Sequence, residues 1–410
     1  MRKWLRKALA ALLAALLAGH GSAVFATETI QVATFIPPDQ WNSDWAPQIN
    51  YCKAQAGVEL EHIVLGHGTF TEQIFLMATA GEMPDVLLIP PERVAPIVHQ
   101  GLLENLDPWI ERYQLDQSQW LPTAIHGTRF EGVNFGFAAY IVNYTYAYNP
   151  EILLQRGVAP PGPTEWVTWD QVRETARRTH VDQDGDGAPE VVGFVNGTVY
   201  VQFLPFVRQA GGEIYDAEGF VQFNSEPVKE ALEFFLALNQ EGIHQGARDL
   251  FWTGKAATER MGSWEVQYVL NNGTPVATAA GIQHKVKSDV AYPTAWAMAS
   301  ASDQKDAAWR FLTCVVSKEA QDEVVKRGLV PMRRDVDLPR ERGEILQGFI
   351  NTLEYSGSYP YHVQADFVLQ SFDRMMPPVF AGQAPAASVL AELDRMINAY
   401  IRDERAQQAR

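Results

Sequence analysis

The chain has few of the residues and motifs from which catalytic or metal centres are usually built. Only two of its 410 residues are cysteines, too few for a typical four-ligand structural zinc site. It contains no Gly-x-Ser-x-Gly nucleophile turn and no His-Glu-x-x-His zinc helix. The pair Gly254-Lys255 lacks the earlier glycine of a phosphate-binding loop, because Asp249 holds that position. His62 and His67 lie close together but have no Cys or Glu partner at ligand spacing. We therefore expect a protein that is not an enzyme.

Positive charge is scarce as well. The chain has 33 lysines and arginines against 49 aspartates and glutamates, which gives a formal net charge of −16 at pH 7. A field of this sign disfavours nucleic acid and other polyanions at long range. We therefore expect no nucleic-acid partner, although a local basic pocket stays compatible with this charge.

Long apolar runs are confined to the N-terminus, which has the layout of a secretory signal. Four basic residues lie within Arg2–Lys7, and the apolar run Ala8–Ala18 follows them. This run is shorter than the roughly 20 residues of a transmembrane helix. Small residues around Ala26 predict cleavage before Thr27, and the absence of a cysteine there argues against a lipid anchor. Removing residues 1–26 takes four basic residues and no acid from the chain, so the net charge becomes −20. The sequence predicts a soluble periplasmic protein.

Both cysteines lie in the predicted mature chain. Export to an oxidising compartment permits a disulfide between Cys52 and Cys314. Two buried free thiols are the alternative, and the distance between the residues in the fold decides between them.

One acidic segment is typical of a metal loop. Asp182, Asp184 and Asp186 occupy positions one, three and five, followed by a glycine at six, as in calcium-binding loops. Glu190 at position nine would act directly or through water. Gly193 stands at position twelve, where the complete motif has a bidentate glutamate. The predictions are a structural calcium ion or, alternatively, a solvated acidic turn.

Strand and helix patterns alternate after the signal. Predicted strands cover Thr29–Phe35, Val58–Leu65 and Val86–Ile89, and predicted helices cover Asn50–Ala56 and Phe70–Ala80. This β-α-β-α-β order favours a parallel sheet with helices on its faces.

Later helices carry clear start signals. Thr168 and Gln171 form a capping box that predicts a helix over Trp169–Thr179. A proline opens a second helix that ends before Gly242. Helical spacing of apolar residues over Asp306–Val316 predicts a third, and Ser317 is the expected cap of the next.

The segment from Leu250 to Trp264 combines small residues with a glycine-serine turn before a tryptophan. Such a turn lets a bulky ring leave the end of a sheet without backbone strain. Ser263 is the expected N-cap of the run Trp264–Leu270. A long aromatic strand within Phe135–Asn149 is expected to pass from one domain to another.

In this order the segments resemble the family 1 extracellular solute-binding proteins, which include maltose-binding protein. The resemblance extends from about Thr29 to Ile401 and is carried by the segments Pro84–Val86, Gly101–Asp107, Tyr148-Asn149, Gly262–Trp264 and Gly328–Pro331. It implies an α/β, type II periplasmic-binding-protein fold with two lobes. Each lobe would be a mainly parallel sheet flanked by helices, with three crossings between the lobes. The implied boundaries are 27–140 with 284–337 for the N-terminal lobe, and 141–283 with 338–410 for the C-terminal lobe.

The resemblance also implies a function. The protein would be a monomeric substrate-binding component of an ABC importer, needing no cofactor. It would capture a carbohydrate between its lobes and deliver it to permease subunits in the membrane. One alternative is a secreted carbohydrate-active enzyme, for which Asp39, Glu92 and Glu265 would be the candidate carboxylates, although nothing in the sequence pairs them. Another is the same fold with a polyol, glycerophosphodiester or peptide as its ligand.

Aromatic residues are the main binding signal, because flat rings stack on the apolar faces of sugars while amides and carboxylates bond the hydroxyls. By resemblance, the predicted ligand contacts are Asp39, Gln40, Trp41, His67, Glu92, Tyr140, Asn143, Tyr200, Gln202, Ser263, Trp264, Glu265, Tyr292, Trp296, Tyr361 and His362. None of these is a lysine or arginine, so an uncharged ligand is expected. The bulky segment from Tyr292 to Trp296 replaces the glycine-rich turn of many family members and is expected to narrow the pocket.

Overall fold

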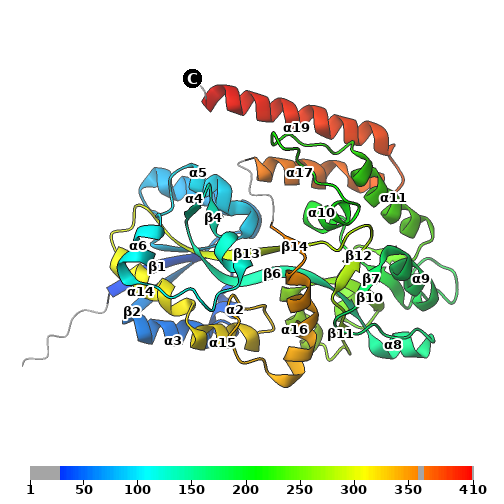
Figure 1. Ribbon diagram of the computed structural model, residues 1–410, viewed down its shortest axis with the longest axis horizontal. Helices are drawn as coiled ribbons and strands as arrows, with labels where there is room; N and C mark the ends of the chain where they lie inside the picture. Colours follow the sequence, from blue (N-terminus) through cyan, green and yellow to red (C-terminus); the bar gives the residue numbers. More distant parts are fainter. Residues whose placement is uncertain (1–27, 359–363, 409–410) are drawn as a thin grey trace, which may run out of the picture.

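A computed structural model describes residues 28–358 and 364–408 of the chain. The predicted signal segment lies outside these residues, and so do the predicted contacts Tyr361 and His362. Figure 1 shows two α/β halves placed side by side, with two long strands running between them. The strands of both halves join into one sheet in the order β2-β1-β3-β13-β6-β10-β8-β9.

The first half contains the strands and helices that the N-terminal pattern predicts. Strand β1 (Glu28–Thr34) pairs in parallel with β2 (Val58–Val64) and with β3 (Val86–Ile89). The predicted helix over Phe70–Ala80 is present as α4, with the same bounds. The other helices of this half are α2 (Pro38–Asn42), α3 (Ala46–Ala56), η1 (His67–Thr69), η2 (Pro91–Arg93), α5 (Val94–His99), α6 (Asp107–Tyr113), α7 (Pro122–His126), α14 (Lys305–Val315) and α15 (Lys318–Lys326), beside the hairpin of β4 (Arg129–Phe130) and β5 (Val133–Asn134).

Three segments pass between the halves. Strand β6 (Phe137–Tyr148) pairs through residues 137–143 with β13 and through residues 144–148 with β10 (Ala256–Gly262), antiparallel in both cases. Strand β13 (Asp289–Met298) continues from β6 to β3 in the first half. The third segment follows α15, where the amide of Ile141 donates to the carbonyl of Val330 at 2.8 Å. The expected two-lobed fold with three crossings is confirmed.

The second half continues the sheet with parallel pairs. Strand β8 (Val192–Val195) lies between β10 and β9 (His244–Gln245) and is parallel to both. Gly193 belongs to β8, where a Cβ atom would lie 2.3 Å from the carbonyl oxygen of Ala176 in α9. Only glycine allows this close contact. The remaining elements are α8 (Pro150–Gln155), β7 (Trp166–Thr168), α9 (Trp169–Thr179), α10 (Tyr200–Gln209), α11 (Glu226–Gln240), α12 (Asp249–Trp252), η3 (Ser263–Glu265), α13 (Val266–Asn271), β11 (Ala277–Thr278), β12 (Gly281–Gln283) and α16 (Arg340–Leu353).

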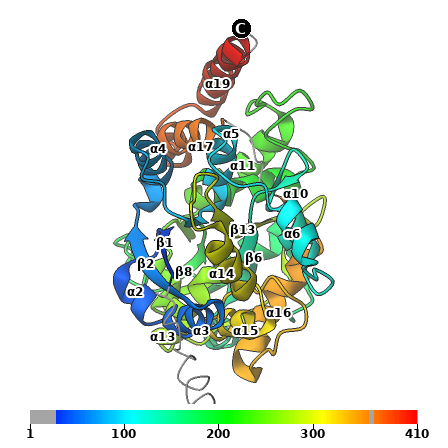
Figure 2. The ribbon, with the colours of Figure 1, turned by 90° about the vertical axis from the view of Figure 1, so that its left-hand side faces the viewer.

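The C-terminal helices cover one end of this assembly. They are α17 (Ala365–Met375), α18 (Pro377–Phe380) and α19 (Ala386–Gln408), and they follow the short strand β14 (Ser356–Gly357). Helix α17 packs on α10 and α19, and it also contacts η2 of the first half. Figures 1 and 2 show α19 outermost in this group. None of the helices within residues 28–358 and 364–408 has the length and apolar character needed to cross a bilayer.

The local signals for capping act as predicted at two helices. Thr168 and Gln171 form the reciprocal capping box of α9. The hydroxyl of Ser317 accepts from the amide of Ala320 at the start of α15. Both contacts satisfy amide groups that the first turn of a helix leaves without a partner.

The two cysteines are joined in the first half. Cys52 of α3 and Cys314 of α14 form a disulfide with their Cα atoms 5.5 Å apart. Helices α3 and α14 pack directly against each other. The bond therefore links the start of the first half to the segment that returns to it after the second crossing.

Candidate functional site

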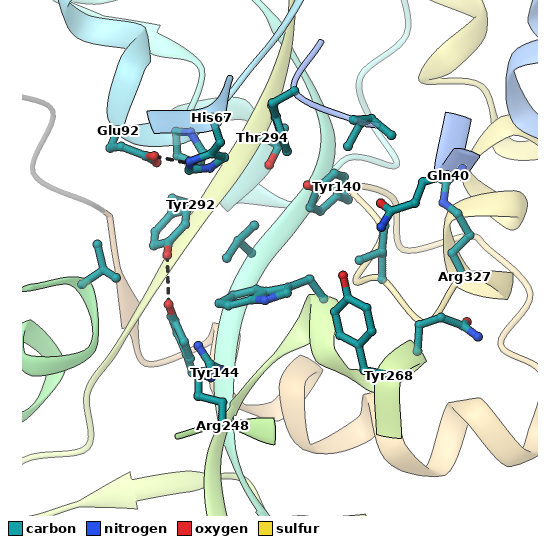
Figure 3. A pocket seen from close by; sticks show the side chains of 18 of the residues that line it. Gln40, His67, Glu92, Tyr140, Tyr144, Arg248, Tyr268, Tyr292, Thr294 and Arg327 are labelled. Carbon is teal, nitrogen blue, oxygen red and sulfur yellow. Dashed lines mark hydrogen bonds and ion pairs between the residues drawn. The ribbon is translucent and has the colours of Figure 1, made fainter. Parts of the chain in front are cut away.

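A cavity of about 570 Å³ lies between the two halves, beside the strands that connect them. In open α/β sheets, loops after the carboxyl ends of parallel strands converge at such a position. The walls come from the loops and helices of both halves and from the cavity-facing side chains of β6 and β13. Figure 3 shows side chains from all these elements pointing into one space.

The wall of the first half is formed after β1, β2 and β3. Gln40 of α2, His67 of η1 and Glu92 of η2, three of the contacts that the resemblance implies, line the cavity. The Nε2 atom of His67 is 3.7 Å from a Glu92 carboxylate oxygen. Trp45 completes this wall with an aromatic face.

The connecting strands supply tyrosines. Tyr140 and Tyr144 of β6 line the cavity together with Tyr292 of β13. Tyr140 and Tyr144 share the cavity face of β6 because side chains four residues apart on a strand point the same way. The hydroxyls of Tyr144 and Tyr292 are 3.3 Å apart (Figure 3).

The wall of the second half presents Trp264, with Tyr268 one helical turn later. A Cβ atom on Gly262 would lie 2.3 Å from the Trp264 ring, so glycine is required for the indole to fold back over the strand end. The ring meets Tyr144 edge-on with centroids 5.2 Å apart. The prediction of Ser263 as an N-cap is wrong, because its hydroxyl donates to the carbonyl of Ile141 at 3.2 Å.

Beneath Trp264 lies an ionic cluster that the sequence did not suggest. Arg248 lines the cavity, with its guanidinium carbon 5.0 Å from the centre of the Trp264 ring. Behind it are two fully buried carboxylates, Glu259 at 3.2 Å and Glu265 in direct contact. Glu265 also accepts from the indole of Trp252 at 3.1 Å. Burial raises the pKa of Glu259 to about 7, and the charge of Arg248 offsets only part of that effect.

A buried arginine, Arg327, lines the opposite wall. Arg327 follows the last turn of α15 and stacks on Trp45, 4.1 Å from the ring centre. Its Nη2 donates to Gln48 at 2.8 Å. Burial lowers the pKa of Arg327 to about 10, so the group still carries its charge at neutral pH.

The structure separates the predicted contacts into three groups. Those that line the cavity are Gln40, His67, Glu92, Tyr140, Gln202, Trp264 and Tyr292. Those that lie outside its lining are Asp39, Trp41, Asn143, Tyr200, Ser263, Glu265 and Trp296. Tyr361 and His362 lie outside the described residues.

Residues of the second group have other partners. Trp41 stacks on His62 with centroids 4.0 Å apart, and Trp296 lies fully buried behind Trp45. Asn143 points away from the cavity and donates to the carbonyl of Phe349 at 2.7 Å. Glu265 holds Arg248 from behind, as described above.

Tyr200 is also outside the lining. It lies in helix α10, buried against Phe223 and Phe372. Gln202, about half a turn later in the same helix, does line the cavity. Pro205 lies inside this helix, and a proline in such a segment is a local signal against a helix.

Several lining residues were missed. Tyr144 and Tyr268 follow the predicted Tyr140 and Trp264 at a spacing of four, so periodicity would have found both. Arg93 directly follows the predicted Glu92. The positions of Arg248 and Arg327 depend on packing between distant segments, and the sequence carries no comparable signal for them.

The acidic loop lies away from the cavity, between α9 and β8. One carboxylate oxygen from each of Asp182, Asp184 and Asp186 falls within 4.8 Å of the others. The carboxylate of Glu190 instead accepts from the amide of Gln183 at 3.1 Å. Position twelve of the loop, Gly193, is held as glycine by its contact with α9.

Comparisons with known proteins agree with this architecture. Residues 34–322 match the family model described as bacterial extracellular solute-binding protein. An ABC substrate-binding protein from Listeria monocytogenes in complex with cycloalternan has a TM-score of 0.80 at 17% identity, covering 92% of this chain and 99% of that one. The maltose/maltodextrin-binding domain from Bdellovibrio bacteriovorus bound to maltotriose has a TM-score of 0.77 at 18% identity, covering 91% and 100%. A solute-binding protein from Agrobacterium radiobacter in complex with ribitol also has a TM-score of 0.77, at 19% identity, covering 91% and 98%. At these identities the likeness to solved structures shows a shared fold.

Proposed function

The chain belongs to the bacterial extracellular solute-binding proteins, and on that basis we propose that it captures a carbohydrate in its cavity for an ABC importer. The loaded protein would then dock on permease subunits in the membrane. The solved structures of similar fold with cycloalternan and maltotriose support a carbohydrate, and the one with ribitol supports a polyol as the nearest alternative.

The observation that carries the proposal is the composition of the cavity wall. Trp45, Tyr140, Tyr144, Trp264 and Tyr292 all line one space. Flat rings of this kind stack on the C–H faces of sugars, and neighbouring amides and hydroxyls bond the sugar hydroxyls. Amide side chains from Gln40, Gln202, Gln267 and Asn271 reach the same space.

Capture would work by closure of the two halves. Because the walls come from both halves, a ligand that contacts both binds the closed form better than the open form. That difference shifts the population toward closure, and the connecting strands provide the hinge. A micromolar dissociation constant corresponds to about 8 kcal/mol, which a few stacked rings and hydrogen bonds supply.

We propose binding without turnover. Hydrolysis of a glycosidic bond uses two carboxyl groups on either side of it. Of the three carboxylates considered from the sequence, Glu92 lines the cavity, whereas Asp39 lies outside the lining and Glu265 is buried behind Arg248. Asp44 is a further lining carboxylate, and it is solvent-exposed.

A thermal-shift screen of the mature protein tests this function. Neutral sugars, polyols and glycerophosphodiesters are added singly, and a stabilising compound is then titrated by calorimetry and checked for breakdown by chromatography. We expect a rise in melting temperature for at least one sugar, with the compound recovered intact. Stabilisation by polyols alone would replace the carbohydrate, and breakdown would show an enzyme.

Export to the periplasm as a monomer is part of the proposal. The family is extracellular, and the Cys52–Cys314 disulfide suits an oxidising compartment. N-terminal sequencing of the protein from the periplasmic fraction should begin at Thr27, and size-exclusion chromatography should give one chain per particle. An uncleaved protein in the cytoplasm would contradict this localisation.

We also propose the lobe boundaries given by the resemblance, 27–140 with 284–337 and 141–283 with 338–410. The change of pairing partner within β6 supports a hinge near residues 143 and 144. Small-angle scattering with and without ligand tests movement of these units. An unchanged radius of gyration at saturation would reject the hinge.

For the acidic loop we propose a structural calcium ion held by Asp182, Asp184 and Asp186. Carboxylate oxygens are the ligands that calcium prefers, and the ion would hold the loop between α9 and β8. Calorimetric titration of calcium into the metal-free protein should give heat that the Asp184→Asn variant lacks. No heat at millimolar calcium would reject the ion.

A further inference from the structure

The expectation of an uncharged ligand rested on the absence of lysine and arginine among the predicted contacts. The structure changes that premise, because Arg93, Arg248 and Arg327 all line the cavity. Whether they call for an anion depends on whether the protein already neutralises them.

Two of the three have carboxylate partners. The Nη1 atom of Arg93 is 2.8 Å from a carboxylate oxygen of Asp366, and its Nε is 3.8 Å from Glu92. Arg248 lies between the buried carboxylates of Glu259 and Glu265. Their charges are thus balanced within the fold.

Arg327 differs from both. Among residues 28–358 and 364–408, no carboxylate oxygen lies within 4.0 Å of its side-chain nitrogens. Within the described part of the chain its Nε and Nη1 are buried without a hydrogen-bond partner, and Nη2 donates only to the neutral amide of Gln48. The whole residue is 9% exposed.

The surroundings of Arg327 stabilise a cation without neutralising it. The Trp45 face and the carbonyl end of α15 both favour positive charge. Neither carries a full negative charge. The carboxylates of Glu323 and Asp44 also favour the cation, but both lie more than 4.0 Å from its nitrogens, and Glu323 is paired with Lys326. A buried charge without a counter-charge loses much of its hydration energy, so an anion brought beside it gains more than it would at the surface. Guanidinium groups suit carboxylates and phosphates best, because their donors match the oxygens of these groups.

We propose that the ligand carries a carboxylate or phosphate group that lies against Arg327. The ligand class is then an acidic sugar or a phosphorylated polyol, with its apolar face on Trp264 across the cavity. This inference rests on the proposed function and narrows its substrate class.

The negative residues of the wall leave room for such a group. Glu92 is engaged by Arg93 and His67. Asp44 is exposed, so water and salt screen its charge, whereas the buried Arg327 is screened less. The net effect on an anion beside Arg327 is attractive.

Matched pairs of ligands test the proposal by calorimetry. Glucuronate is compared with glucose, galacturonate with galactose, and glycerol 3-phosphate with glycerol. We expect the acid of at least one pair to bind at least tenfold more tightly than its neutral partner, and added salt to reduce this ratio. The uronates and the phosphate distinguish the two sources of the anion.

The variant Arg327→Gln should bring the ratio of acid to neutral affinity close to one, while the neutral partner loses less than threefold. Arg112→Gln is the matched control, because it removes the same charge from an exposed position on α6 outside the cavity. If Arg327→Gln does not fold, Arg327→Lys and the salt dependence of the natural chain replace it.

The outcomes separate the inference from the function. Neutral sugars that bind as tightly as their acids, or an Arg327→Gln variant that weakens both equally, would overturn the inference and leave sugar capture standing. If no sugar, polyol or acid binds, the proposed function itself fails.

Discussion

Each of the two walls of the cavity places an arginine beside a tryptophan, yet the walls differ in charge balance. In the second half, Arg248 beneath Trp264 is enclosed by Glu259 and Glu265. In the first half, Arg327 against Trp45 has no such carboxylate among the described residues.

Because of this difference, the two arginines are expected to have different roles. An internally neutralised cluster costs stability when one member is removed, because the others lose their partner in a dry environment. A cation without a neighbouring carboxylate instead attracts a negatively charged group of a ligand that enters the cavity. Changes around Arg248 should therefore act mainly on folding, and changes around Arg327 mainly on ligand choice.

The largest effect is expected at Glu265. Its carboxylate accepts from Trp252 and from the amide of Gly262, and it contacts Arg248. Glu265→Ala should lower the free energy of unfolding by about 3–5 kcal/mol, as for other broken buried ion pairs. Urea denaturation measures this loss. Glu265→Gln, which keeps an acceptor, should lose less, and a loss under about 1 kcal/mol for alanine would contradict the neutralised-cluster view.

The disulfide tests the stability of the opposite wall. It fixes α3, the helix that follows Trp45 and contains Gln48, to α14. Replacing Cys52 and Cys314 with alanine should lower the free energy of unfolding by about 2–5 kcal/mol. The comparison is made by urea denaturation, with dithiothreitol added to the natural chain as a second route to the same state. Identical curves with and without reductant would show that the bond does not constrain this wall.

Trp264 tests the ring that the neutralised wall presents to the ligand. Trp264→Ala should weaken sugar binding more than tenfold, or about 1.4 kcal/mol, because it removes the stacking face while the cluster beneath stays in place. Calorimetry measures the affinity, and circular dichroism checks the fold. Trp264→Phe should keep part of the binding. Unchanged affinity in the alanine variant would move the ligand elsewhere.

The pH dependence of stability tests whether the Glu259 carboxyl beside Arg248 is charged in the folded chain. Burial raises its pKa from 4.5 to about 7 in the folded chain, so the folded state holds this proton more tightly than the unfolded state. Its contribution to stability is therefore full below pH 4.5 and is lost as pH rises through about 7. Between these values the slope from this group is at most about 1.4 kcal/mol per pH unit. Glu259→Gln should remove that slope. If the free energy of unfolding changed with pH in the same way in the natural chain and in Glu259→Gln, the raised pKa of Glu259 would be disproved.

Much of the fold was predictable because its signals are local. The helix over Phe70–Ala80 and the strand over Val86–Ile89 have the predicted bounds, and the capping box at Thr168 starts α9. Each depends on periodicity or on a cap within a few residues. Helix α10 was not foreseen, because Pro205 within it is a local signal that tertiary packing overrides.

Some residues that line the cavity were predictable, because they follow the ends of strands. Gln40, His67 and Glu92, which the resemblance implies as ligand contacts, follow the ends of parallel strands and line the same cavity. The position of Arg327 in the cavity wall was not predictable. Arg327 follows α15, but it contacts Trp45 and Gln48, which lie hundreds of residues earlier in the chain. The lack of a carboxylate within 4.0 Å of Arg327, among residues 28–358 and 364–408, results from packing of distant segments, and no short stretch of sequence shows it.

The smallest effect is expected at a contact that bridges the walls. Arg93 follows β3 in the first half, and Asp366 begins α17, which packs on the second half. If this pair forms on closure, Asp366→Asn should weaken the binding of every ligand about three- to tenfold, because closure then loses one ion pair between the halves. The acid and neutral members of a pair should weaken alike, in contrast to Arg327→Gln. Calorimetry with one matched pair makes the distinction, since an effect confined to the acid would mean that Arg93, released from Asp366, takes part in reading its charge.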